Sequence, residues 1–187
     1  MPEKIYIDQG HNPVNPNAGA EGSGLREQDL VYTIGQRLAA LLRANPNFEV
    51  RLSRPTADTQ LGSSTNTSLS ARVRDANAWG ADYFISLHTN AASNSSASGS
   101  EAYVYARGTQ AFNFAEDILT NLTDITGLRD RGVAARPGLY VLRKTQMPAT
   151  LVELGFITNP GDAALMRDNP GLFAEGIYRG IKEYTGV

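Results

Sequence analysis

The chain contains the run KIYIDQGH at residues 4–11, and the run ADYFISLH at residues 81–88 repeats its form. Both are rich in β-branched and aromatic residues, and both end in a histidine that precedes a segment rich in Asn, Pro, Ala and Ser. Such runs predict strands, and residues 4–8 are typical of a strand buried on both faces of a parallel sheet. Functional groups gather at the carboxyl ends of strands in open α/β sheets. We therefore expect His11 and His88, the two histidines of the chain, to mark a site.

Strand and helix patterns alternate along the rest of the chain. Further strands are predicted at 49–53, 82–88, 101–105, 139–143 and 150–154. Apolar side chains at helical spacing predict helices over 27–45, from about Ser68, over 110–126 and from the Asn169-Pro170 pair. Turn-forming or polar residues predict loops at 10–24, 55–67 and 89–100. This order, without repeat or linker, predicts an α/β fold in which helices cover both faces of one mixed sheet.

Composition excludes several classes of protein. A chain of 187 residues is most simply one domain, which buries about 70% of its unfolded surface. The net charge of −2 gives no electrostatic reason to expect nucleic acid or an anionic membrane as a partner. No apolar stretch approaches the ~20 residues of a membrane span, and residues 1–4 show no signal peptide. There is no cysteine, so nitrogen and oxygen atoms must hold any metal.

His11, Glu27 and His88 are candidate metal ligands, because catalytic zinc takes three protein ligands and leaves one position for water. Their wide spacing matches no short metal motif. Either histidine, taken singly, is also explained as a capping or core residue. Glu27, taken alone, is better explained as a first-turn acid that the helix dipole stabilises. The hypothesis depends on the two histidines closing strands at one edge of the sheet.

Glu153 lies in the apolar run PATLVELGF at residues 148–156. An isolated buried carboxylate costs roughly several kcal/mol unless it is paired or neutral. A water at the metal or a proton of the substrate would provide the missing partner. Since a carboxyl group with a raised pKa suits a general base, Glu153 is predicted to be catalytic.

The residues then point to a family. The chain resembles the zinc-dependent N-acetylmuramoyl-L-alanine amidases, the cell-wall amidase family that includes division and spore amidases and phage endolysins. The resemblance runs in order over about residues 4–185. Its segments are IDQGH (7–11), GAEGSGLRE (19–27), LSARVRDAN (69–77), FISLHTNA (84–91), GSEAY (99–103) and PATLVELGFITN (148–159).

The resemblance implies one zinc ion on His11, Glu27 and His88, with Glu153 as the catalytic glutamate. It implies a six-stranded, mostly parallel mixed sheet with flanking helices, which agrees with the pattern above. The implied substrate is peptidoglycan, cut at the amide between N-acetylmuramic acid and the L-alanine of the stem peptide.

Further candidate residues surround this set. Asn90 and Glu101 are candidates for orienting a ligand or contacting substrate, with hydrogen bonding within the loop and strand as the alternative. Asp8 is a candidate partner for a histidine ring nitrogen.

Two departures from the family pattern concern the loops. The segment after His11 is NPVNP at 12–16, where the family is usually glycine-rich, and this changes the shape of the site loop. Some members carry a long regulatory helix after the second histidine. Residues 89–100 are too short and polar for one, so we expect an open site without a plug.

Two other functions compete with the amidase. A zinc peptidase or deacylase acting on another amide would share every residue named. A non-catalytic wall-binding regulator would be expected to lack one of the four residues, and this chain keeps all four.

We expect residues 1–187 to form one monomeric catalytic domain that acts outside the cytoplasm, in the cell wall, the periplasm or secreted, with phage lysis as another route of release. An activator protein, a separate wall-binding domain or the site itself would then direct it to the wall.

Overall fold

The computed structural model describes residues 1–187, and its six main strands form one sheet in the order β4-β1-β5-β8-β6-β7. Neighbouring strands run parallel except β6 and β8, which are antiparallel. This confirms the predicted mostly parallel mixed sheet. The strands are β1 (Glu3–Gln9), β4 (Phe48–Leu52), β5 (Tyr83–Asn90), β6 (Ser100–Val104), β7 (Asp130–Ala135) and β8 (Ala149–Phe156).

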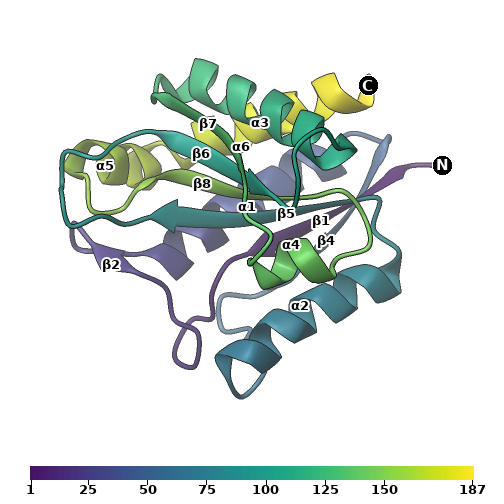
Figure 1. Cartoon of the computed structure of the whole chain (residues 1–187), viewed down its shortest axis with the longest axis horizontal. Helices are drawn as coiled ribbons and strands as arrows, with labels where there is room; N and C mark the ends of the chain where they lie inside the picture. Colours follow the sequence, from purple (N-terminus) through teal and green to yellow (C-terminus); the bar gives the residue numbers. More distant parts are fainter.

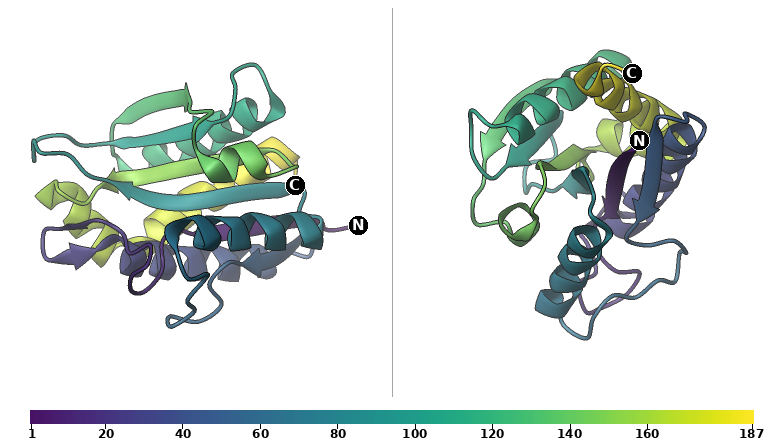
Figure 2. Two further views of the ribbon diagram at one scale, coloured as in Figure 1. Left: turned by 60° about the horizontal axis from the view of Figure 1, so that its bottom comes forward. Right: turned by 90° about the vertical axis from the view of Figure 1, so that its right-hand side faces the viewer.

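Helices cover both faces of the sheet, as predicted (Figure 1). Along β1, Ile5 and Ile7 point into a core formed with α1, α3 and α6, whereas Tyr6 points into a core formed with α2 and α4. Figure 2 shows these two layers from the side and from the end. The helices are α1 (Glu27–Arg43), α2 (Thr65–Trp79), α3 (Gln110–Thr126), α4 (Tyr140–Lys144), α5 (Pro160–Asp168) and α6 (Pro170–Thr185). None combines the length and the apolar character needed to cross a membrane.

The predicted strand at 139–143 is wrong, because this segment is the short helix α4. Its Val141 and Leu142 are buried against the α2 side of the sheet. A short apolar run has no period that separates a strand from a helical turn. The sixth strand is instead β7, an edge strand in which Val133 is the one buried residue, so its sequence carries little signal.

Other boundaries differ for local reasons. The helix predicted from Ser68 begins at Thr65, because Ser64 and Thr67 form a reciprocal capping box at its N-terminus. The loop predicted at 10–24 contains strand β2 (Glu21–Gly22) and the turn of a small antiparallel hairpin, whose second strand β3 (Leu25–Arg26) follows directly. Helix α5 was not predicted, and the side chain of Asn159 caps it. Residues 91–99 connect β5 to β6 without a helix.

Helices α3 and α6 pack at backbone contact. A Cβ atom added at Gly180 of α6 would lie 2.4 Å from the Cα atom of Ile118 in α3, and one added at Gly176 would lie 2.7 Å from that of Leu122. The two helices can therefore approach this closely only because α6 carries glycine at both positions.

We expect Gly180→Ala to lower the free energy of unfolding by about 1–3 kcal/mol, because the added methyl group must push backbone away from backbone. Gly171→Ala on the same helix is the matched control, since its Cβ would meet nothing within 4 Å. Urea unfolding of both variants checks the prediction. Equal stabilities would show that α3 and α6 separate without cost.

Candidate active site

The three candidate metal ligands come together at the carboxyl edge of the sheet. His11 follows β1, His88 lies in β5, and Glu27 begins α1. One ligand atom from each residue lies within 4.8 Å of the others. Because β1 and β5 are parallel neighbours, their ends meet at the same edge, and the loop that contains the β2–β3 hairpin brings Glu27 to it.

The Glu27 carboxylate lies between the two histidines. Its Oε2 is 3.1 Å from Nε2 of His11, and its Oε1 is 3.1 Å from Nδ1 of His88. The backbone N–H groups of Ala20 and Thr89 also donate to it, each at 2.9 Å. Burial alone would raise the pKa of Glu27, but the hydrogen bonds and charges of the two histidines outweigh burial and hold this pKa far below its usual range. The group is therefore a permanent anion.

The arrangement fits a metal ion. Two imidazoles and one carboxylate form the nitrogen and oxygen donor set that zinc accepts. The Nδ1 atom of His11 is buried and has no hydrogen-bond partner. The side chains of His11 and His88 remain 20% and 18% exposed, so one side of the cluster is open to solvent.

A buried arginine holds the turn that carries His11. Arg72 of α2 donates hydrogen bonds to the backbone carbonyls of Gln9 (2.7 Å) and His11, and to the Asp8 carboxylate (2.6 Å). His11 has a φ of +66°, which is uncommon for a residue with a side chain. The Arg72 contacts therefore fix a backbone turn that the local sequence would not favour.

Asp8 supports this turn and does not contact a histidine ring. Its two oxygens accept from Arg72 and from the hydroxyl of Ser86, the latter at 2.7 Å. Burial raises the pKa of Asp8, but the charge and hydrogen bonds of Arg72 and Ser86 outweigh burial and hold it below its usual range. Its role is to pair with Arg72 inside the protein, so the candidate role at a ring nitrogen is not what the structure shows.

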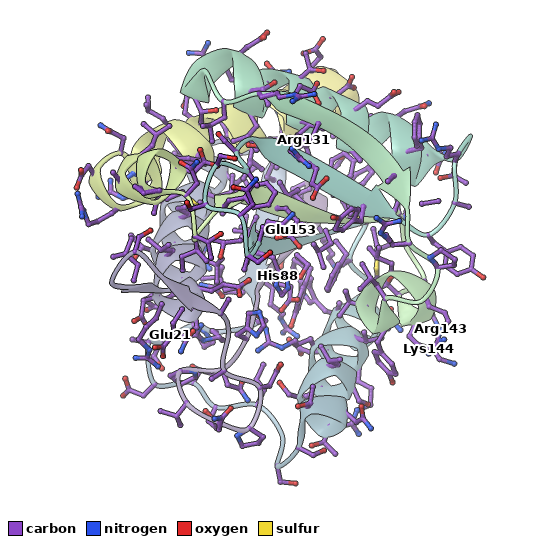
Figure 3. All side chains as sticks on the ribbon, turned by 60° about the vertical axis from the view of Figure 1, so that its left-hand side comes forward. Glu21, His88, Arg131, Arg143, Lys144 and Glu153 are labelled. Carbon is purple, nitrogen blue, oxygen red and sulfur yellow. The ribbon has the colours of Figure 1, made fainter.

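Glu153 lies beside the cluster on β8. It is opposite His88 in the register of β5 and β8, and Figure 3 shows the two side chains close together. Its Oε2 atom is buried without a hydrogen-bond partner. Burial raises the pKa of Glu153 to about 8, helped by the charges of Glu27 and Glu101. The raised pKa expected from the sequence is thus present, with two neighbouring carboxylates as an additional cause.

Asn90 and Glu101 contact each other. The Asn90 side-chain N–H donates to Oε1 of Glu101, and the hydroxyl of Tyr103 donates to the same oxygen at 2.8 Å. Nε of Arg131 lies 3.6 Å from Oε2 of Glu101. Since Glu101 is also opposite Glu153 in the register of β6 and β8, this group of side chains forms one wall of the site.

The chain is similar in sequence to known amidases. A family model described as N-acetylmuramoyl-L-alanine amidase matches residues 5–183. The chain belongs to this family. It is 35% identical over 95% of its length to the N-acetylmuramoyl-L-alanine amidase CwlM of Bacillus licheniformis, and 39% identical over 88% of its length to the amidase LytC of Bacillus subtilis.

A solved structure confirms the fold of this family member. The catalytic domain of CwlV, an N-acetylmuramoyl-L-alanine amidase from Bacillus (Paenibacillus) polymyxa var. colistinus, matches with a TM-score of 0.86 and 32% identity, covering 99% of both chains. Both relatives are longer than this chain, which spans 65% of CwlM and 32% of LytC. The resemblance seen in the sequence is therefore confirmed at the level of family and fold.

The sequence alone did not identify Arg72 and Arg131 as residues that shape the site. Arg72 lies in a segment that matches the family, but a lone arginine on a helix gives no sign that its guanidinium is buried. Arg131 lies in β7, which was not predicted as a strand. Tyr103 could have been placed beside Glu101, because the two are separated by one residue in an alternating strand.

We expect Arg72→Lys to weaken zinc binding about 10–100-fold, because an ammonium group cannot hold both carbonyls and Asp8 in the same geometry. Arg54→Lys is the matched control. Arg54 is equally buried, but its guanidinium donates to the backbone carbonyls of Gln28 and Ala57. It contacts no backbone carbonyl of a candidate metal ligand. Calorimetric zinc titration of both variants checks this, and equal losses of affinity would contradict it.

The raised pKa of Glu153 predicts a pH-dependent stability. The folded, metal-free protein keeps this proton up to about pH 8, whereas the unfolded chain releases it near the ordinary value of 4.5. The folded state therefore binds more protons across this window, so its free energy of unfolding falls as pH rises.

Glu153→Gln removes this titration. We expect its stability advantage over the wild type to grow between pH 4.5 and pH 8, to on the order of a few kcal/mol. Urea unfolding of both metal-free proteins across this range, with a chelator present, measures the difference. Parallel stability curves would show that the Glu153 carboxyl is not perturbed.

Proposed function

We propose that the protein is a peptidoglycan hydrolase that cleaves the amide between N-acetylmuramic acid and the L-alanine of the stem peptide. Residues 1–187 act as one monomeric catalytic domain. The observation that supports this most strongly is Glu153, a buried carboxyl group with a raised pKa that lies beside His11, Glu27 and His88. Membership of the amidase family indicates which amide this site cuts.

His11, Glu27 and His88 hold one zinc ion in this proposal. Three protein ligands of this type leave a coordination position for water or substrate, as catalytic zinc sites require. When bound, zinc supplies Lewis acidity that polarises the scissile carbonyl and makes water more acidic. The backbone N–H groups of Ala20 and Thr89 donate to the Glu27 carboxylate and hold its position.

Glu153 moves the proton. Its carboxylate accepts a proton from the attacking water, whose oxygen bonds to the carbonyl carbon. Its carboxyl group then gives the proton to the alanine nitrogen as the carbon–nitrogen bond breaks. The products are the free carboxylic acid of the muramic acid and a stem peptide with a free amino terminus. A pKa near neutral pH allows one group to act as base and then as acid.

The place of action follows from the substrate. Peptidoglycan lies outside the cytoplasmic membrane, so the protein works in an extracytoplasmic compartment or after release by lysis. An activator protein or a wall-binding domain brings the catalytic domain to the wall.

Mass spectrometry of purified peptidoglycan digested with zinc-loaded protein tests the bond that is cut. We expect intact stem peptides with a free L-alanine amino terminus, together with muramic acid that carries no peptide. Fragments cut within the stem peptide would contradict the amidase and support a peptidase.

Variants test the roles of the residues. We expect Glu153→Gln to keep one zinc per chain and lose turnover about 10²–10⁴-fold, because the proton acceptor is gone. His88→Ala loses zinc and turnover together. Glu116→Gln, an exposed carboxylate on α3, is the matched control and changes neither. Turnover by Glu153→Gln at the wild-type rate would rule out its assigned role.

A further inference from the structure

We propose that Arg136 binds a carboxylate of the stem peptide on the leaving-group side of the scissile amide. The enzyme then prefers peptides whose second residue carries a free α-carboxylate over those in which it is a carboxamide. This inference rests on the proposed amidase activity and adds a residue that determines its specificity.

A series of contacts leads from Glu153 to Arg136. In the antiparallel pair of β6 and β8, Glu101 is opposite Glu153 and Tyr103 is opposite Leu151. Residues two apart in a strand share a face of the sheet, so Tyr103 lies on the same face as Glu101 and Glu153. Its hydroxyl donates to Glu101 at 2.8 Å, which directs the tyrosine ring along the strand toward the site.

Arg136 is held over this ring. Its backbone N–H donates to the carbonyl of Val104 at 2.8 Å, directly after β7 ends, and its guanidinium carbon lies 5.1 Å from the centroid of the Tyr103 ring. The side chain is exposed and forms no ion pair or hydrogen bond within the protein. Stacking therefore orients the guanidinium while leaving its five N–H donors for a ligand.

The other arginine near the site is already used. Arg131 lies 3.6 Å from Glu101, donates to the carbonyl of Ser98, and covers the ring of Phe156. In Figure 3 Arg131 lies near Glu153, whereas Arg143 on α4 lies well apart from it. Arg136, by contrast, stacks on Tyr103 and has no hydrogen-bond or ion-pair partner for its guanidinium group.

The spacing matches the peptide. Leu151, which is opposite Tyr103, lies two positions from Glu153 in β8, and two positions correspond to about 7 Å along a strand. Two residues of an extended peptide also span about 7 Å, so the second residue after the cut bond reaches Tyr103 when the scissile amide lies at Glu153.

Charge gives the reason for a cation at this place. Glu101 is the acidic group of this wall beside Glu153, and its charge repels an anionic peptide. A guanidinium group binds a carboxylate through two parallel hydrogen bonds, which offsets that repulsion where the peptide leaves the catalytic residues.

Two synthetic substrates test the proposal. Both are N-acetylmuramoyl tripeptides that begin with L-alanine and continue with a glutamate that is joined to the third residue through its γ-carboxyl group. They differ only in whether the α-carboxyl group of that glutamate is free or is a carboxamide. For the zinc-loaded wild type we expect kcat/KM to favour the carboxylate about 10–100-fold, mostly through KM, because the contact is to a part of the substrate that does not react.

Variants at Arg136 then test whether this residue causes the preference. Arg136→Gln should bring the ratio of the two kcat/KM values close to one, mainly by lowering kcat/KM for the carboxylate substrate. Unchanged zinc binding and an unchanged free energy of unfolding show that the variant is folded. Arg136→Lys should keep part of the preference. Arg143→Gln, an exposed arginine of α4, is the matched control and should keep all of it.

Three results would overturn the proposal: no preference in the wild type, an unchanged preference in Arg136→Gln, or the same loss in Arg143→Gln. Failure to cleave either substrate would instead overturn the proposed amidase function, and this inference with it. Cleavage of the carboxamide by the wild type separates the two cases, because it requires the amidase activity but no preference for the carboxylate.

Discussion

The Glu27 carboxylate is the constraint on which the site depends. It is buried and ionised, and four donors from two parts of the chain surround it: the His11 ring and the Ala20 backbone N–H from the loop after β1, and the His88 ring and the Thr89 backbone N–H from β5. A buried anion without such partners would cost roughly several kcal/mol. The loop after β1, the start of α1 and the end of β5 therefore have to meet at one point, and metal ligation becomes possible because they do.

A second buried charge supports the first. Arg72 pairs with Asp8 and also holds the backbone at Gln9 and His11. Both charged side chains are 1% exposed, so neither can be replaced by water. Their pairing links α2 to the end of β1 and sets the unusual backbone angle of His11. Glycine at position 10 completes the arrangement, because a Cβ atom there would lie 2.5 Å from the ring of His88.

Three carboxyl groups within one site have different properties because their surroundings differ. Glu27 is surrounded by donors and stays ionised, whereas Glu153 has a buried oxygen without a donor and keeps its proton up to about pH 8. Glu101 is satisfied by Asn90, Tyr103 and Arg131. The reversal of β6 relative to β8 is what brings Glu101 opposite Glu153 and places the tyrosine beside them.

Residues with local signals could be identified from the sequence. His11 and His88 close β-rich runs, and Glu153 interrupts an apolar one, so these residues are predicted as a site from local signals, and the resemblance over six segments indicates the family. The pairing of Asn90 with Glu101, the burial of Arg72, the edge strand β7 and the stacking of Arg136 on Tyr103 had no such signal. Each depends on segments far apart in the chain, and α4 resembled a strand because a five-residue apolar run fits either form. Strand pairing and burial across the sheet supplied this information, since they alone determine which distant side chains share a face.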